Sequence, residues 1–205
     1  MSYFTAREIA SITIFAALWG ILSTTLSPIF YKLFHLPFLC DLIGFTSIIL
    51  AVWWVEKIGT ATSVGLIATI INFMFRPTAM HFLGFSAASI VFDILAFTSG
   101  YKRLFEQKIL GSILLTAISI ISAAVAGVII GALFMSPMAL QRWGGVLGWA
   151  GLHAIGGTIG GVVGISLMNA LISRGITPSK KEEERRERLN RSRYLLRLNL
   201  KHVRL

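Results

Sequence analysis

The stretch "GGVLGWAGLHAIGGTIGGVVGISLMNALIS", residues 144–173, carries no formal charge along its whole length. A helix that crosses a bilayer needs roughly 20 consecutive, mostly apolar residues, so this stretch is long enough to span a membrane. Its glycines recur at four-residue intervals in two rows, Gly156/Gly160/Gly164 and Gly157/Gly161. Because small residues at this spacing let helix backbones approach closely, the stretch predicts a membrane helix with close neighbours.

The composition of the rest of the chain indicates the same environment. Of the 205 residues, 55% are hydrophobic and only 14% are charged, and the mean hydropathy is +0.76. Soluble domains carry about 25% charged residues, so this chain has too few to cover a water-exposed surface. One membrane domain therefore accounts for nearly all of the sequence.

Apolar segments separated by short polar breaks predict an all-α fold, a bundle of six transmembrane helices. The segments run approximately over residues 8–32, 36–56, 58–76, 79–100, 108–135 and 144–173. The breaks between them are short, and the second and third segments are joined so tightly, at Glu56–Gly59, that they predict an antiparallel pair.

The distribution of basic residues predicts an orientation with both termini in the cytoplasm. With the N-terminus inside, the inner side carries Arg7, Lys57, Lys102, Arg103, Lys108 and the basic tail. The outer side then carries only Lys32, Arg76 and Arg142. We therefore expect a multi-pass protein of the cell membrane, the plasma membrane.

The sequence divides into a membrane domain, residues 1–175, and a basic cytoplasmic tail, residues 176–205. From Arg174 onward, eleven Lys and Arg residues stand against four Glu, so about +7 of the net charge of +10 belongs to this end of the chain. The basic character is thus confined to an appendage and does not predict a nucleic-acid partner. The tail is interpreted as a solvated or surface-lying helix, and the alternative is a docking site for a partner or anionic lipids.

Two further rows of small residues accompany the glycine rows of residues 144–173. The segment 108–135 contains Ala123, Gly127 and Gly131 at four-residue spacing, and the first segment contains Ala16 and Gly20. Two interpretations remain open for each row: packing inside the bundle, or a face that meets another membrane protein.

Polar and aromatic residues gather at the predicted outer ends of the helices, and His153 lies on the same helix face as Trp149 and Gly157. A polar ring facing lipid is costly, so this face should point into the bundle. The residues that we expect to form a solute site are Tyr31, Asp41, Asn72, Arg76, His81, Trp143, Trp149 and His153. Aromatic rings with a few polar groups suit a small, polar, ring-bearing ligand.

The competing interpretation is a metal site with Asp41, His81 and His153 as ligands, although their spacing does not favour metal over an organic solute. The chain has no GxxxxGK[ST], HExxH or GxSxG pattern, so the usual signatures of nucleotide hydrolysis and of two hydrolase classes are missing. We expect a protein that is not an enzyme and needs no cofactor.

The chain resembles the substrate-binding S components of energy-coupling factor (ECF) transporters over about residues 5–175. The resemblance rests on the chain's size, six predicted helices with both ends inside, the opening "REIASITIFAALWGIL" at residues 7–22, and the glycine-rich last helix. In that family the small-residue motif of the first helix contacts a transmembrane T component. The resemblance implies this role for Ala16 and Gly20, where Gly20 departs from the usual alanine.

The resemblance also implies a function. It predicts a substrate-capture subunit of an ATP-driven importer, which binds a vitamin or vitamin precursor on the extracellular side, under a loop at about residues 31–38. The stretch "VEKIGTATSVGLIATIINFM", residues 55–74, is similar to the hydroxymethylpyrimidine/thiamine type. The opening "MSYFTARE" lacks the histidine of the metal-transporting branch. The partners would be the T component and ATPase subunits; the alternatives are an intramembrane metal-dependent enzyme and a scaffold that recruits partners through its tail.

Overall fold

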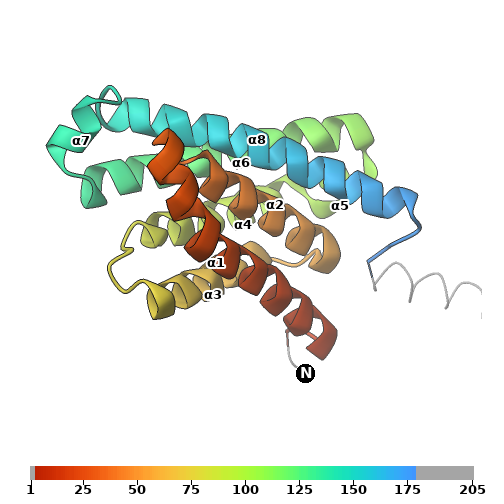
Figure 1. Cartoon of the computed structure of the whole chain (residues 1–205). Coiled ribbons are helices and arrows are strands. Elements are labelled where there is room, and N and C mark those ends of the chain that lie inside the picture. The colour runs from red at the N-terminus through yellow and green to blue at the C-terminus, as the bar shows by residue number, and fades with distance from the viewer. Residues whose placement is uncertain (1–2, 179–205) are drawn as a thin grey trace, which may run out of the picture.

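The computed structural model describes residues 3–178, and all the regular elements in this part of the chain are helices (Figure 1). The long helices are α1 (Ala6–Phe34), α2 (Phe38–Val55), α3 (Thr60–Phe75), α4 (Phe82–Ser99), α6 (Lys108–Phe134) and α8 (Gly145–Ser173). They match the six predicted segments to within three residues at each end. Two short helices that were expected as loops are α5 (Tyr101–Glu106) and α7 (Pro137–Gln141). Apart from its first three residues, the predicted tail, residues 176–205, lies outside the described residues.

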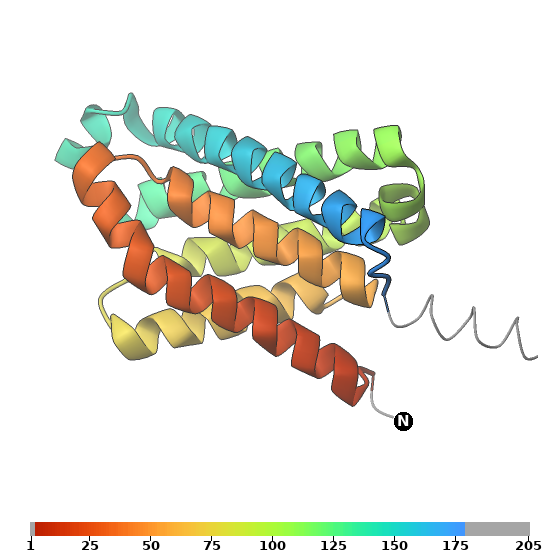
Figure 2. The same ribbon diagram turned by 45° about the vertical axis from the view of Figure 1, so that its right-hand side comes forward.

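The long helices form a closed ring in which consecutive long helices contact each other and α2 also packs on α8, far along the chain. Going round the ring, α1 packs on α3, α3 on α4, α4 on α6, α6 on α8, α8 on α2, and α2 returns to α1. Helices α2 and α3 also touch across the ring, and Figure 2 shows the roughly parallel helix axes. The tight α2–α3 connection was correctly predicted to join a contacting pair.

Five of these helices are long and apolar enough to cross a membrane: α1, α2, α4, α6 and α8. Helix α3 is apolar but has only 16 residues. At 1.5 Å per residue it is about 24 Å long, shorter than a hydrocarbon core of about 30 Å. The structure therefore agrees with a helical membrane bundle with five candidate spans in residues 3–178, and α3 is the sixth long helix of the ring.

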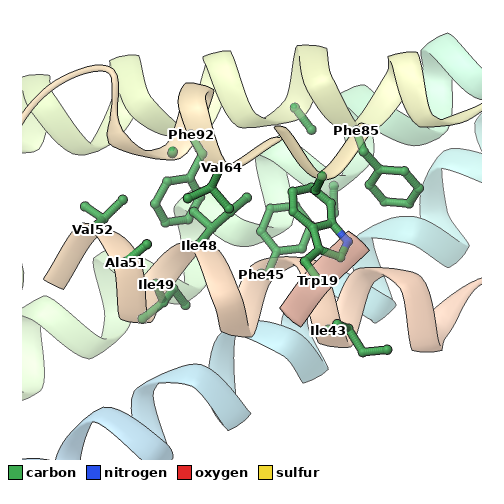
Figure 3. Packing of buried hydrophobic residues seen from close by; sticks show 14 of the residues in the cluster. Trp19, Ile43, Phe45, Ile48, Ile49, Ala51, Val52, Val64, Phe85 and Phe92 are labelled. Carbon is green, nitrogen blue, oxygen red and sulfur yellow. The ribbon is translucent and has the colours of Figure 1, made fainter. Parts of the chain in front are cut away.

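The interior of the ring is filled by large apolar side chains, mostly from α2 (Figure 3). Phe45 and Ile48 of α2 are fully buried beside Trp19 of α1 and Phe92 of α4. Trp19 lies so close to Gly44 that a methyl group there would come within 2.9 Å of the indole ring. This packing closes the middle of the bundle.

The glycine rows of α8 are packing surfaces for two different helices. A methyl group on Gly156 would collide with the Asp41 side chain, and one on Gly160 would lie 2.7 Å from the backbone oxygen of Asp41 in α2. On the other row, a methyl group on Gly157 would lie 2.7 Å from the backbone oxygen of Ser119 in α6. The prediction that α8 packs closely against neighbours is confirmed, and the two rows explain why α8 sits between α2 and α6.

The small residues of α1 also pack inside the chain. Ala16 has no exposed surface, and a methyl group on Gly20 would come within 2.9 Å of Ile71 in α3. Gly20 therefore packs against α3, because the smooth surface of the row allows close approach within the chain. The expectation that Ala16 and Gly20 form a partner-contacting face stays a prediction. Internal packing, the other interpretation of these rows, fits the contacts of the rows in α8 and α1.

Both ends of the described chain lie at the same end of the bundle, on the right in Figure 1. Here Lys57, in the α2–α3 turn, forms an ion pair of 2.7 Å with Glu8 of α1, and Glu8 also caps the start of α1. Asp93 of α4 accepts a hydrogen bond of 3.0 Å from the Thr62 backbone N–H, in the first turn of α3. A carboxylate is favourable at a helix N-terminus, so these contacts tie together three helix ends.

Candidate functional site

A cavity of about 350 Å³ opens at the other end of the bundle, which we call the cavity end. Its lining comes from the C-terminal parts of α1 and α6, the N-terminal parts of α2, α4 and α8, and Arg76 at the end of α3. Pro28 lies inside α1 and lines the cavity. Because proline removes a backbone hydrogen bond, it loosens α1 at this level. The cavity thus depends on every long helix of the ring.

A buried histidine–carboxylate pair stands at the floor of this cavity. His153 of α8 lines it, and the Nδ1 atom of His153 lies 3.0 Å from Asp41 Oδ1 of α2. His153 is only 2% exposed and Asp41 is not exposed at all. The pair forms because Gly156, one turn after His153, has no side chain and leaves room for the carboxylate. A buried charge needs a partner of this kind.

Aromatic rings surround His153 on the cavity side. The centroid of the imidazole lies 5.4 Å from that of Trp149 and 5.7 Å from that of Phe85, both in edge-to-face geometry. Phe82 stacks beside Phe85 at 5.7 Å. These three rings line the cavity and form an apolar wall that a flat ligand ring can contact.

Several polar atoms of the lining have no hydrogen-bond partner among residues 3–178. They are Ser23 Oγ, Ser27 Oγ, Trp149 Nε1 and His153 Nε2. Buried polar groups are normally paired, and an unpaired one costs about 1–3 kcal/mol. Groups of this kind around one cavity are typical of a site that receives a ligand or ordered water.

The mouth of the cavity is basic. Three exposed residues line the cavity here: Tyr31, Lys32 and Arg76. His81, in the turn before α4, also lines it, and burial, reinforced by the charge of Arg76, lowers the pKa of His81 to about 4. His81 is therefore a neutral imidazole at physiological pH, and Lys32 and Arg76 supply the charge.

Five of the eight predicted site residues line the cavity: Tyr31, Arg76, His81, Trp149 and His153. Two others stand behind the lining. Asp41 holds His153, and the Trp143 ring packs on Trp149 at a centroid distance of 6.2 Å. The structure therefore brings seven of the eight residues to one end of the bundle, and their role in binding a solute stays a prediction.

The eighth residue, Asn72, is engaged elsewhere. Its side-chain oxygen accepts a 2.6 Å hydrogen bond from Thr24 of α1, and its amide nitrogen donates to the Ala68 backbone oxygen. Asn72 therefore links α1 to α3 and does not line the cavity. Hydropathy and spacing could not reveal this, because the partner hydroxyl is 48 residues away in the sequence.

Other residues of the lining were not predicted from the sequence. Ser23 and Ser27 are spaced by four residues on α1, so they share a helix face with each other, and this spacing was a usable signal. Phe82 and Phe85 looked like ordinary apolar residues of a span. Cys40, in the first turn of α2, lines the cavity as well.

The structure does not support the metal interpretation. In residues 3–178, no group of three or more His, Cys, Asp or Glu side chains is arranged to hold a metal ion. Asp41 and His153 are paired with each other, and His81 instead packs on Phe82, with ring centroids 4.7 Å apart. The expectation that Asp41, His81 and His153 together could ligate a metal is thus corrected.

Comparisons with known proteins find no matching family model, no matching curated protein and no matching solved structure for this chain.

Proposed function

We propose that this protein is a membrane-embedded solute-capture subunit, which binds a small ring-bearing solute in the cavity and works with partner subunits that drive its release. The observation that carries the proposal is the cavity itself. It is open at one end of the bundle, has an aromatic wall, and holds four unpartnered polar atoms around it.

The packing beneath the cavity favours capture over free conduction. Below His153, the space inside the ring is filled by Phe45, Ile48 and Phe92. A channel needs a polar or hydrated path through the membrane, and this apolar layer would oppose one. A solute that enters at the cavity end would stay there until the helices rearrange.

A cavity that is open at one end and closed below by apolar packing also supports a more specific role, the S component of an ECF-type importer. Such a subunit needs a T component and ATPase subunits, and the sequence has no nucleotide-binding loop of its own. In this proposal the protein crosses the plasma membrane six times, α3 being the short span, and both termini are cytoplasmic. The cavity then faces outward, and the solute is a vitamin or vitamin precursor.

The buried position of Ala16 and Gly20 changes where a T component would bind. Other residues of α1 are exposed and apolar, including Ile14, Leu18 and Ile21. In this proposal the T component contacts that outer face of α1, or α1 must move away from α3 during transport.

Ligand-dependent thermal stability of the purified full-length chain tests the proposal. A panel of vitamins and precursors, including thiamine and hydroxymethylpyrimidine, should contain a compound that raises the melting temperature. A ligand at about 100 times its dissociation constant adds about 2.7 kcal/mol of stability. A panel without any stabilising compound would count against solute capture.

Two variants sharpen this experiment. Trp149→Ala should abolish most of the stabilisation because it removes one ring of the aromatic wall and one donor, whereas deletion of residues 176–205 should preserve it. If the deletion alone removed the response, the tail and not the cavity would carry the activity.

A further inference from the structure

Building on the proposed function, we infer that the cavity selects solutes that carry negative charge. Two independent features of the cavity support this inference: the sign of the charges at its mouth, and the hydrogen-bonding character of the free groups at its floor.

The charged side chains of the lining are all basic. Lys32 and Arg76 stand at the mouth, and no Asp or Glu of the described residues belongs to the lining. The nearest carboxylate, Asp41, is paired with His153. A mouth lined by one sign of charge, with low-dielectric walls, raises the local concentration of counter-charged solutes.

Helix dipoles do not decide the sign of the cavity. Helices α2, α4 and α8 begin at this end, whereas α1, α3 and α6 end there. Their partial positive and negative ends largely offset one another. The side-chain charges of Lys32 and Arg76 therefore set the potential at the mouth.

The floor of the cavity offers hydrogen-bond donors. An indole nitrogen such as Trp149 Nε1 only donates. The buried pair avoids an uncompensated charge when it is neutral overall, either as an imidazolium with a carboxylate or as an imidazole with a carboxylic acid. In the first form, and in the second form when the acid donates its hydrogen to Nδ1, the Nε2 atom of His153 carries a hydrogen. The atom lies in the lining and has no partner in the described part of the chain, so with its hydrogen it can donate to a solute.

The floor and the mouth of the cavity therefore both favour an anionic solute with acceptor oxygens. A donor at the floor needs an acceptor on the solute, and the oxygens of a carboxylate, sulfonate or phosphate accept strongly. The hydroxyl groups of Ser23 and Ser27 can donate as well. A cationic solute would meet Lys32 and Arg76 at the mouth and N–H groups at the floor, and both would disfavour it.

Cys40 allows the charge of the cavity to be measured without knowing the solute. It is the only cysteine of the chain, and it lines the cavity. Methanethiosulfonates transfer their thioalkyl group to the thiolate, which forms a disulfide and releases methanesulfinate. The probes are sulfonatoethyl (negative), trimethylammonioethyl (positive) and methyl (neutral) methanethiosulfonate, each normalised to its rate with free mercaptoethanol.

We expect the negative probe to modify Cys40 roughly tenfold faster than the positive probe at low salt, after normalisation, and this ratio to shrink in high salt. The Lys32→Gln/Arg76→Gln double variant should bring the ratio close to one. Arg142→Gln is the matched control, since Arg142 is an exposed base at the cavity end but outside the lining, and it should retain most of the preference.

Each other outcome overturns a defined claim. A ratio near one in the unmodified protein, or a faster positive probe, would refute anion selectivity and leave solute capture standing. An undiminished ratio in the double variant would refute the role of Lys32 and Arg76. The neutral probe is also run at alkaline pH, with the denatured protein as the positive control. If Cys40 reacted only after denaturation, the cavity would be closed to solutes, and the proposed function would fall together with this inference.

Discussion

At the scale of single residues, the Asp41–His153 pair is the contact on which the cavity floor depends. The two side chains come from α2 and α8 and are 112 residues apart in the sequence. Both side chains are buried, so each needs the other as a hydrogen-bond partner to offset the free-energy cost of burying a polar or charged group. The pair also fixes the ring of His153, which orients its free Nε2 atom.

Removing both partners of this pair should cost less than the sum of the two single removals. We expect Asp41→Ala and His153→Ala each to lower the free energy of unfolding by about 2–4 kcal/mol, because a buried polar group is left unpaired. The double variant should lose about 1–2 kcal/mol less than the sum of the two. Denaturant unfolding of the purified proteins in micelles measures this coupling, and strictly additive losses would contradict it.

At the scale of elements, α8 is held by two glycine rows that face different helices. The row with Gly160 meets α2, where Thr46 also donates a hydrogen bond of 3.2 Å to the Gly160 backbone oxygen. The row with Gly157 meets α6. Close backbone approach on both sides provides the van der Waals contact that replaces the hydrophobic effect inside a membrane.

A single methyl group on the α2-facing row should therefore disturb the bundle. We expect Gly160→Ala to destabilise the protein by about 1–3 kcal/mol, because the new methyl group would meet the α2 backbone, which cannot move without shifting the helix. Melting temperatures of the purified variants measure the effect.

Gly151→Ala is the matched control on the same helix. A methyl group on Gly151 would meet nothing within 4 Å, and alanine favours a helix over glycine by up to about 1 kcal/mol. Its stability should be unchanged or slightly higher. Equal destabilisation by both substitutions would show that helix propensity, and not the approach of α2, controls this helix.

At the scale of the whole molecule, the ring of helices separates two chemically different ends. The cavity end carries Lys32, Arg76 and the opening of the cavity. The opposite end carries both ends of the described chain and the exposed bases Lys102 and Arg103. If the end with Lys102 and Arg103 is cytoplasmic, as the positive-inside rule predicts, the cavity faces the exterior.

Labelling of single cysteines in intact cells tests this orientation. In a Cys40→Ser background, Arg142→Cys at the cavity end should react with a membrane-impermeant maleimide added outside. Lys102→Cys should react only after the cells are permeabilised, since it lies at the opposite end. The reverse pattern would place the cavity in the cytoplasm and would contradict solute capture from outside.

Much of this architecture was predictable from the sequence, and the residues explain why. The boundaries of the six long helices follow from hydropathy and charge, which are local properties, so α8 was expected at 144–173 and begins at Gly145. The cavity-end location of Trp149, His153 and Arg76 follows from counting helix turns. Asn72 could not be placed, because its bond to Thr24 depends on how α1 and α3 are rotated against each other.

The sequence by itself determined a membrane bundle of apolar helices, the smooth faces of those helices, and the gathering of polar groups at one end. These features depend on local composition and on the 3.6-residue period of the helix. Only the tertiary structure decided that α8 lies between α2 and α6, that α3 packs on Gly20, and that Asp41 pairs with His153. Small-residue rows are alike along a chain, so the choice of partner for each row emerges only when all six helices pack together.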